Sequence, residues 1–156
     1  MSISDIIEQF ILDSIGDDEF ISISRNQLAD FFKCVPSQIN YVLATRFTID
    51  KGFIVESKRG GGGYIIISRL PDEDNIKYIT SLVNNGFLQQ LSQIQADQIL
   101  DRLLASNLIN ARERKILSSA FSDKALLVPD SIKPSVRANI LKNILVEILK
   151  NISQQS

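Results

Sequence analysis

Residues 24–47 read SRNQLADFFKCVPSQINYVLATRF and predict two short helices joined by a tight turn. Ser24 is a good N-cap residue, so a first helix is expected to begin directly after it and to run to Phe32. Pro36 has a preset φ angle and no backbone N–H to lose, which suits the first turn of a second helix that ends near Phe47. This pattern is typical of a helix-turn-helix, whose second helix can lie in the major groove of DNA.

The second helix has two different faces. Its apolar residues recur at helical spacing and are expected to point into the core: Ile39, Val42, Leu43 and Phe47. The opposite face is polar and almost uncharged, with Arg46 at its margin, and comprises Ser37, Gln38, Asn40, Tyr41, Ala44 and Thr45. Amides and hydroxyls suit the recognition of base edges because they donate and accept hydrogen bonds at fixed geometry. A face that only contacts solvent fits the same residues, so this helix alone leaves both interpretations open.

A β-hairpin is predicted after this helix. Two β-rich runs, residues 53–58 and 64–69, flank Arg59 and four consecutive glycines, Gly60, Gly61, Gly62 and Gly63. The hairpin would be the wing of a winged helix. A glycine run without side chains can enter a narrow minor groove and carry Lys58 and Arg59 with it. A loop without a function is one alternative, and a phosphate-binding loop is another, although no helix N-terminus and no Gly-Lys-Ser or Gly-Lys-Thr follows.

After Pro71 the pattern predicts helices only, so we expect a winged helix-turn-helix DNA-binding domain at residues 1–71 and an all-α domain of four helices at residues 72–156. The third of these helices should turn Ile116, Leu117 and Phe121 inward. The last has an apolar face wider than one neighbouring helix needs, which predicts a dimer interface at Ile140, Leu141, Ile144, Leu145, Ile148 and Leu149. Complete burial of this face within its own domain is the alternative. The fold class is therefore mostly α with a small β-hairpin.

The composition excludes several kinds of catalytic and metal site. The 156 residues include no histidine and a single cysteine, Cys34, so Ser-His-Asp and Cys-His catalysis, His/Cys zinc sites and intrachain disulfides are excluded. We therefore predict no enzyme, no cofactor and no metal. Because no apolar run could span a bilayer and the start lacks the features of a signal peptide, we expect a cytoplasmic protein without a membrane partner.

The charges are unevenly distributed along the chain. The formal net charge is -1, but residues 1–24 contain six acidic residues and no basic one, whereas residues 25–70 contain seven basic and three acidic residues. A locally basic segment on a slightly acidic protein can hold DNA phosphates without binding every polyanion. The charge pattern therefore fits double-stranded DNA as a partner of the first domain, but the excess of four positive charges is too small to indicate it alone.

Three strings closely resemble the class-three stress-gene repressor family, CtsR: CVPSQINYV at residues 34–42, TRFT at residues 45–48 and ESKRGGGGYI at residues 56–65. The start SDIIE at residues 4–8 and ARER at residues 111–114 are also similar to that family, so the resemblance covers most of the chain. It implies a dimeric transcriptional repressor of heat-shock and protein-quality-control genes, those for Clp proteases and chaperones, that binds tandem-repeat operators.

The resemblance also implies how such a repressor is regulated. The glycine-rich wing would sense temperature, and a protein-arginine kinase with its adaptor and the Clp protease system would act on the protein. Arg59 is the matching candidate for phosphorylation, and Arg25 and Arg46 are candidate phosphate contacts. Leu43-Ala44 departs from the family pattern, which would have a β-branched and then a polar residue, so one groove contact is missing at Ala44. An interaction module without DNA specificity is the alternative function.

Overall fold

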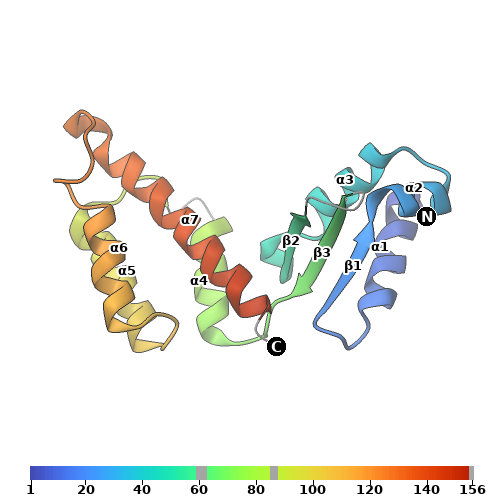
Figure 1. Cartoon of the computed structure of the whole chain (residues 1–156), viewed down its shortest axis with the longest axis horizontal. Coiled ribbons are helices and arrows are strands. Elements are labelled where there is room, and N and C mark those ends of the chain that lie inside the picture. Colours follow the sequence, from blue (N-terminus) through green and yellow to red (C-terminus); the bar gives the residue numbers. More distant parts are fainter. Residues whose placement is uncertain (59–62, 85–87, 155–156) are drawn as a thin grey trace. The chain divides into compact units, whose positions relative to one another are not determined.

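The computed structural model describes residues 1–58, 63–84 and 88–154 (Figure 1). The chain forms two compact units, one comprising Met1–Asp72 with the residues from Leu149 onward and the other Glu73–Ile148. The first unit contains, in chain order, α1 (Ile3–Ile15), β1 (Phe20–Ser24), α2 (Arg25–Phe32), α3 (Pro36–Arg46), the 3₁₀ helix η1 (Ile49–Lys51), β2 (Phe53–Lys58) and β3 (Tyr64–Arg69).

The ends of the first three helices are fixed by local signals. The Ser2 and Asp5 side chains form a capping box at the start of α1, which ends at Gly16 with a φ of 52°. The Ser24 hydroxyl accepts a hydrogen bond from the backbone N–H of Gln27 and caps α2, as predicted. Lys33 takes a left-handed conformation with a φ of 54° after α2, and Pro36 begins α3. The predicted bounds of both helices are confirmed.

The core of this unit is built from all three helices and the sheet. All four residues that were predicted to point inward from the second helix are buried: Ile39, Val42, Leu43 and Phe47. They pack against buried residues of α1, α2, β2 and β3, including Ile7, Ile11, Ile15, Leu28, Ala29, Phe53, Ile65 and Ile67. Since each such side chain contributes about 1.5–3 kcal/mol on full burial, the apolar face of α3 fixes the direction of its polar face.

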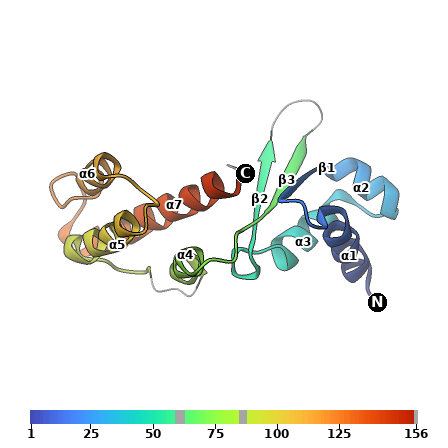
Figure 2. The ribbon, with the colours of Figure 1, turned by 90° about the horizontal axis from the view of Figure 1, so that it is seen from below.

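The predicted hairpin is one part of a three-stranded antiparallel sheet in the order β1-β3-β2. β2 and β3 lie side by side in register from Phe53 opposite Arg69 to Lys58 opposite Tyr64 (Figure 2). β1 pairs with the other edge of β3, with Ile23 opposite Ile65. The pairing runs along β3 as far as Tyr64, opposite Ser24, and so joins the hairpin to the segment that leads directly into α2.

The second unit is all α, as predicted. It contains α4 (Asp74–Asn84), α5 (Gln93–Ala105), α6 (Ala111–Ala120), the 3₁₀ helix η2 (Asp130–Ile132) and most of α7 (Lys133–Gln154). Ser92 forms a capping box with Gln95 at the start of α5. The buried residues of this unit include Ile76, Ile79, Val83, Ala96, Leu100, Leu103, Phe121, Ala138, Leu141 and Leu145.

The prediction that Ile116 points inward is wrong, because its side chain is 53% exposed. α6 contacts α5 partly through polar pairs: the Ser118 hydroxyl donates to Asp97 at 2.6 Å, and Arg114 Nε donates to Asp101 at 2.9 Å. Phe121 caps the end of α6 and is fully buried, whereas Leu117 is half-buried. The polar contacts set the rotation of α6 and leave Ile116 on its outer face.

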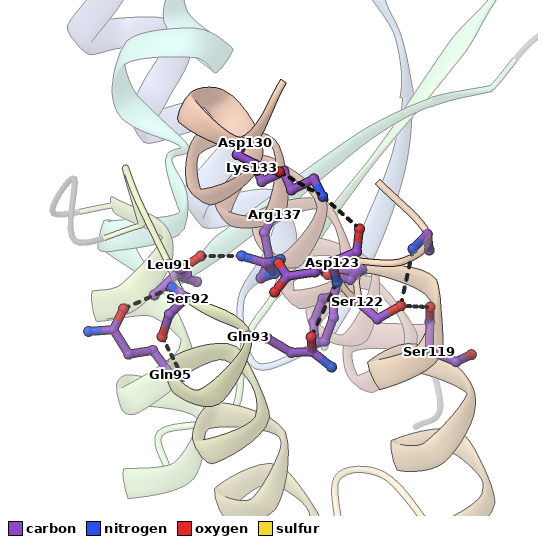
Figure 3. Close-up of polar contacts among 12 residues, drawn as sticks. Leu91, Ser92, Gln93, Gln95, Ser119, Ser122, Asp123, Asp130, Lys133 and Arg137 are labelled. Atoms are coloured by element: carbon purple, nitrogen blue, oxygen red, sulfur yellow. Dashed lines mark hydrogen bonds and ion pairs between the residues drawn. The ribbon is translucent and has the colours of Figure 1, made fainter. Parts of the chain in front are cut away.

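A buried arginine links three segments of the second unit (Figure 3). Arg137 is only 1% exposed. Its Nε donates to the backbone oxygen of Phe121 and its Nη1 to that of Leu91, both at 2.8 Å, and its Nη2 pairs with Asp123. Arg137 therefore joins the segment before α5 and the end of α6 to α7.

No helix in the described part of the chain combines the length and the hydropathy needed to cross a membrane.

Candidate nucleic-acid interface

The outward face of α3 is an exposed polar stripe. It consists of residues at spacings of three, one, three and one, which lie on one side of a helix: Ser37, Asn40, Tyr41, Ala44 and Thr45. Tyr41 is 57% exposed, although its apolar ring could have been buried. The stripe contains no charged side chain. It therefore offers an amide, hydroxyls and an aromatic ring to a partner, and we call it the α3 polar face.

Two contacts order the C-terminal end of this face. The Thr45 hydroxyl donates to the backbone oxygen of Tyr41 at 2.7 Å, so its remaining capacity is to accept a hydrogen bond. The Lys51 ammonium donates to the backbone oxygen of Thr45 at 3.0 Å. A cation at a helix C-terminus is favourable because the last carbonyl groups carry partial negative charge.

Gln38 is half-buried and already has a partner within the protein. Its side-chain nitrogen donates to the Ser4 hydroxyl of α1 at 2.9 Å. Ser4 is itself buried, at 7% exposure. This bond leaves the side-chain oxygen and one N–H of Gln38 for the predicted base contact, which stays a prediction.

Arg46 is not the free cation that we expected. Its Nη1 donates to Asp5 Oδ1 at 2.9 Å and to Glu8 Oε1 at 2.6 Å. The hydrogen bonds to Asp5 and, next, to Glu8 raise the pKa of Arg46. The pKa of Asp5 is lowered, first by the backbone N–H of Ser2, then by the Ser2 side chain and by Arg46. Two carboxylates of α1 thus accept from Nη1 of Arg46 in the free protein, and the contact of Arg46 with a phosphate stays a prediction.

Arg25 lies next to the end of β2 that leads into the glycine run. Its Nη2 donates to the Ser57 hydroxyl of β2 at 2.5 Å, so its neighbour there is neutral and leaves its charge uncompensated. Among the described residues, Arg25 Nε is a buried donor without a hydrogen-bond partner. Lys58, the residue after Ser57, is 3.5 Å from Glu56 and keeps 43% of its side chain exposed. Arg25 and Lys58 therefore bring positive charge to one end of β2.

The rest of the predicted wing contact, Arg59, Gly60, Gly61 and Gly62, lies outside the described residues. Gly63 is described and has a φ of 70°, a left-handed conformation that L side chains rarely adopt. A glycine is therefore required where the chain enters β3.

The residues predicted for the dimer interface differ in exposure. Leu141, Leu145 and Leu149 are fully buried within the chain, whereas Ile140, Ile144 and Ile148 are half-buried. A second copy could contact only the partly exposed isoleucines without rearrangement, and the interface stays a prediction. Sequence reasoning missed the exposed apolar side chains of Ile94 and Leu127, which are 71% and 93% exposed.

Comparison with known proteins gives matches along the chain. Residues 2–71 match the family model of the CtsR N-terminal HTH domain, and residues 72–146 match that of the CtsR C-terminal dimerization domain. The transcriptional regulator CtsR of Bacillus subtilis (strain 168) is 41% identical over 150 residues, which are 94% of this chain and 96% of the relative. The transcriptional regulator CtsR of Geobacillus stearothermophilus is 38% identical over 149 residues, 94% of this chain and 97% of the relative. Among solved structures, the chain is similar to a crystal structure of CtsR in complex with a 26bp DNA duplex. The two sequences are 38% identical, the match includes 94% of this chain and 98% of that chain, and the TM-score is 0.48.

Proposed function

Because the chain belongs to the CtsR family of transcriptional regulators, we propose that the α3 polar face reads the base sequence of an operator. One observation carries the proposal: the exposed stripe from Ser37 to Thr45 is polar and uncharged, and it includes Asn40 and the 57% exposed Tyr41. Asn can bond an adenine edge with both its donor and its acceptor, and Thr and Tyr hydroxyls can bond base edges or phosphates. Binding of this kind represses transcription when the operator overlaps a promoter.

Positive charge beside the glycine run supplies proposed contacts with DNA. Arg25 and Lys58 lie at the end of β2 from which the chain continues into the glycine run. We assign Arg25 to the DNA backbone, and Lys58 and Arg59 with Gly60–Gly63 to the minor groove. Arg46 is left out of this set because Asp5 and Glu8 already bond to it.

A dimer would present two α3 helices to one duplex. The second unit corresponds to a C-terminal dimerization domain, so residues 1–71 would bind DNA and residues 72–156 would hold two copies together. We propose tandem-repeat operators in front of heat-shock and Clp genes, which the family resemblance supports. The test is selection of duplexes from a random pool by the wild-type protein. Enrichment of a motif in two copies at fixed spacing is expected, and a pool without enrichment would contradict the proposal.

Arg59→Ala should weaken binding to the selected duplex on the order of tenfold, because each copy in the dimer loses one cationic contact in the minor groove. Arg59→Asp should weaken binding further, since it places a negative charge near phosphates, as phosphorylation of this arginine by the proposed kinase would. Arg59→Lys retains the charge and is the matched control. Binding is measured by fluorescence anisotropy. If Arg59→Ala, Arg59→Asp and the wild-type protein bind the selected duplex with equal affinity, Arg59 does not contact the DNA.

The proposed temperature response of the wing can be estimated. Fixing the backbone of one residue costs about 1–2 kcal/mol of conformational entropy at 25 °C. This cost grows in proportion to the absolute temperature. If five residues in each of two wings are ordered on binding, a rise of 20 °C therefore makes the free energy of binding less favourable by roughly 0.7–1.3 kcal/mol. Operator affinity should therefore fall about three- to tenfold more between 25 and 45 °C in wild type than in Arg59→Asp, whose wing no longer binds. The measurement is anisotropy at both temperatures, below unfolding. If the operator affinities of the two proteins fall equally with temperature, the wing does not sense temperature.

The alternative is a winged-helix module that binds another protein without DNA specificity. Equal, weak binding to selected and scrambled duplexes would favour it. We further propose that the chain acts without catalysis and in the cytoplasm, which agrees with relatives that are named transcriptional regulators.

A further inference from the structure

The first turns of α1 contact both ends of α3 through polar side chains. Near the start of α3, Gln38 donates to Ser4, and at its last residue Arg46 donates to Asp5 and Glu8. Gln38 and Arg46 are eight residues apart, a distance of about 12 Å along the helix axis. Three neighbouring polar residues of α1 therefore set both the position of α3 and its electrostatic surroundings.

Charge is overcompensated at the end of α3. Arg46 is the only charged residue in the α3 sequence PSQINYVLATR, and both carboxylates accept from the same nitrogen, Nη1. The second oxygen of Asp5 accepts from the backbone N–H of Ser2 at 3.1 Å, so this carboxylate is held on both sides. The guanidinium and the two carboxylates together carry one negative charge, and the Lys51 ammonium on the Thr45 carbonyl lies at the same end of α3.

We propose that Asp5 and Glu8 are specificity-determining residues that keep Arg46 from bonding to a DNA phosphate. The inference rests on the proposed function, in which α3 lies in the major groove. A phosphate contact adds the same affinity at every sequence, whereas base contacts add affinity only at the operator. Both bonds use Nη1, and the two carboxylates neutralise the Arg46 charge that would attract a phosphate, so binding through α3 depends on the bases it meets.

A purely stabilising role would not need this arrangement. The side chains of Arg46, Asp5 and Glu8 are 32%, 40% and 29% exposed, and ion pairs in such positions add little to folding stability. One carboxylate would neutralise the charge of the guanidinium. The second adds negative charge near the DNA, which lowers total affinity and is useful only where sequence-independent binding is to be kept weak.

The test is the salt dependence of binding to a scrambled duplex by the double variant Asp5→Asn, Glu8→Gln. Both substitutions keep hydrogen-bonding groups of similar size and remove the charges that hold Arg46. The slope of log affinity against log salt should steepen by about 0.9 for each bound copy, so affinity should fall roughly threefold more per copy between 50 and 200 mM salt than in wild type. The preference for the selected duplex should decrease.

Two controls separate this effect from net charge and from folding. The triple variant with Arg46→Gln added should return to the wild-type slope, because the new contact requires Arg46. Asp17→Asn, Asp18→Asn removes two exposed carboxylates of the same acidic segment and should leave the slope unchanged. An unchanged slope in the double variant with normal circular dichroism, or a steeper slope that persists in the triple variant, would overturn the inference. A wild-type protein that binds both duplexes equally would instead refute the proposed function, and the scrambled-duplex slopes would still decide the role of Asp5 and Glu8.

Discussion

Asn40→Ala should weaken binding to the operator by about 2–6 kcal/mol in the dimer and leave binding to a scrambled duplex nearly unchanged. One good bidentate contact between a side chain and a base discriminates by about 1–3 kcal/mol, and each of two copies would lose one. Asn40 lies in the middle of the α3 polar face, where alanine retains the helix and removes only the amide. The measurement is a titration of both duplexes by fluorescence anisotropy at one salt concentration.

Asn84→Ala is the matched control, because Asn84 is an exposed amide at the end of α4 in the other unit. Its affinity for both duplexes should equal that of wild type. An Asn40→Ala protein that folds normally and binds the operator as tightly as wild type would show that α3 does not read bases through this residue. An equal loss on both duplexes would assign Asn40 to the DNA backbone.

Arg137→Met should lower the free energy of unfolding of the second unit by about 3–5 kcal/mol. Methionine fills part of the volume but leaves the buried backbone oxygens of Phe121 and Leu91 without their donor. Each unsatisfied buried acceptor costs about 1–3 kcal/mol, and imperfect filling of the site adds to that cost. Guanidinium denaturation followed by circular dichroism measures the loss, at one fixed protomer concentration because dimerisation shifts the apparent stability.

The carboxylate partner provides the comparison. The Asp123 side chain is 65% exposed, so Asp123→Asn should cost less than 1 kcal/mol, roughly the value of an exposed ion pair. The large effect would then belong to the carbonyl contacts of Arg137 and not to its charge pair. An Arg137→Met protein within about 1 kcal/mol of wild type would show that water replaces the guanidinium.

Local signals made much of the first unit predictable. The N-cap at Ser24, Pro36 at the start of the second helix and the apolar spacing from Ile39 to Phe47 depend on neighbouring residues only, and all agree with the structure. The same spacing predicted the exposed residues of α3 except Gln38, which was expected on the outward face and is half-buried against Ser4. The resemblance to the CtsR family, drawn from strings of residues, is confirmed by the matches over both halves of the chain.

Contacts between residues far apart in the chain were not predictable in this way. The periodicity of α3 placed Arg46 at the margin of its polar face, but nothing in that pattern indicated partners on α1, some 40 residues earlier: 38 to Glu8 and 41 to Asp5. The third strand of the sheet depends on a pairing of the same kind, between Ile23 and Ile65. Arg137 lies four residues before Leu141 and so on the same side of the helix, a position that could have suggested its burial. Its hydrogen-bond partners could not be predicted from the sequence.

The most direct test of sequence reading by α3 is the ratio of wild-type affinities for a selected operator duplex and for a scrambled duplex of the same composition, at about 150 mM salt. Specific DNA-binding proteins bind their sites about 10³–10⁷ times more tightly than other DNA. We expect a ratio in this range for wild type and a ratio reduced at least tenfold for Asn40→Ala. Equal affinities of the wild-type protein for the two duplexes would contradict the assignment of α3 as the helix that recognises an operator.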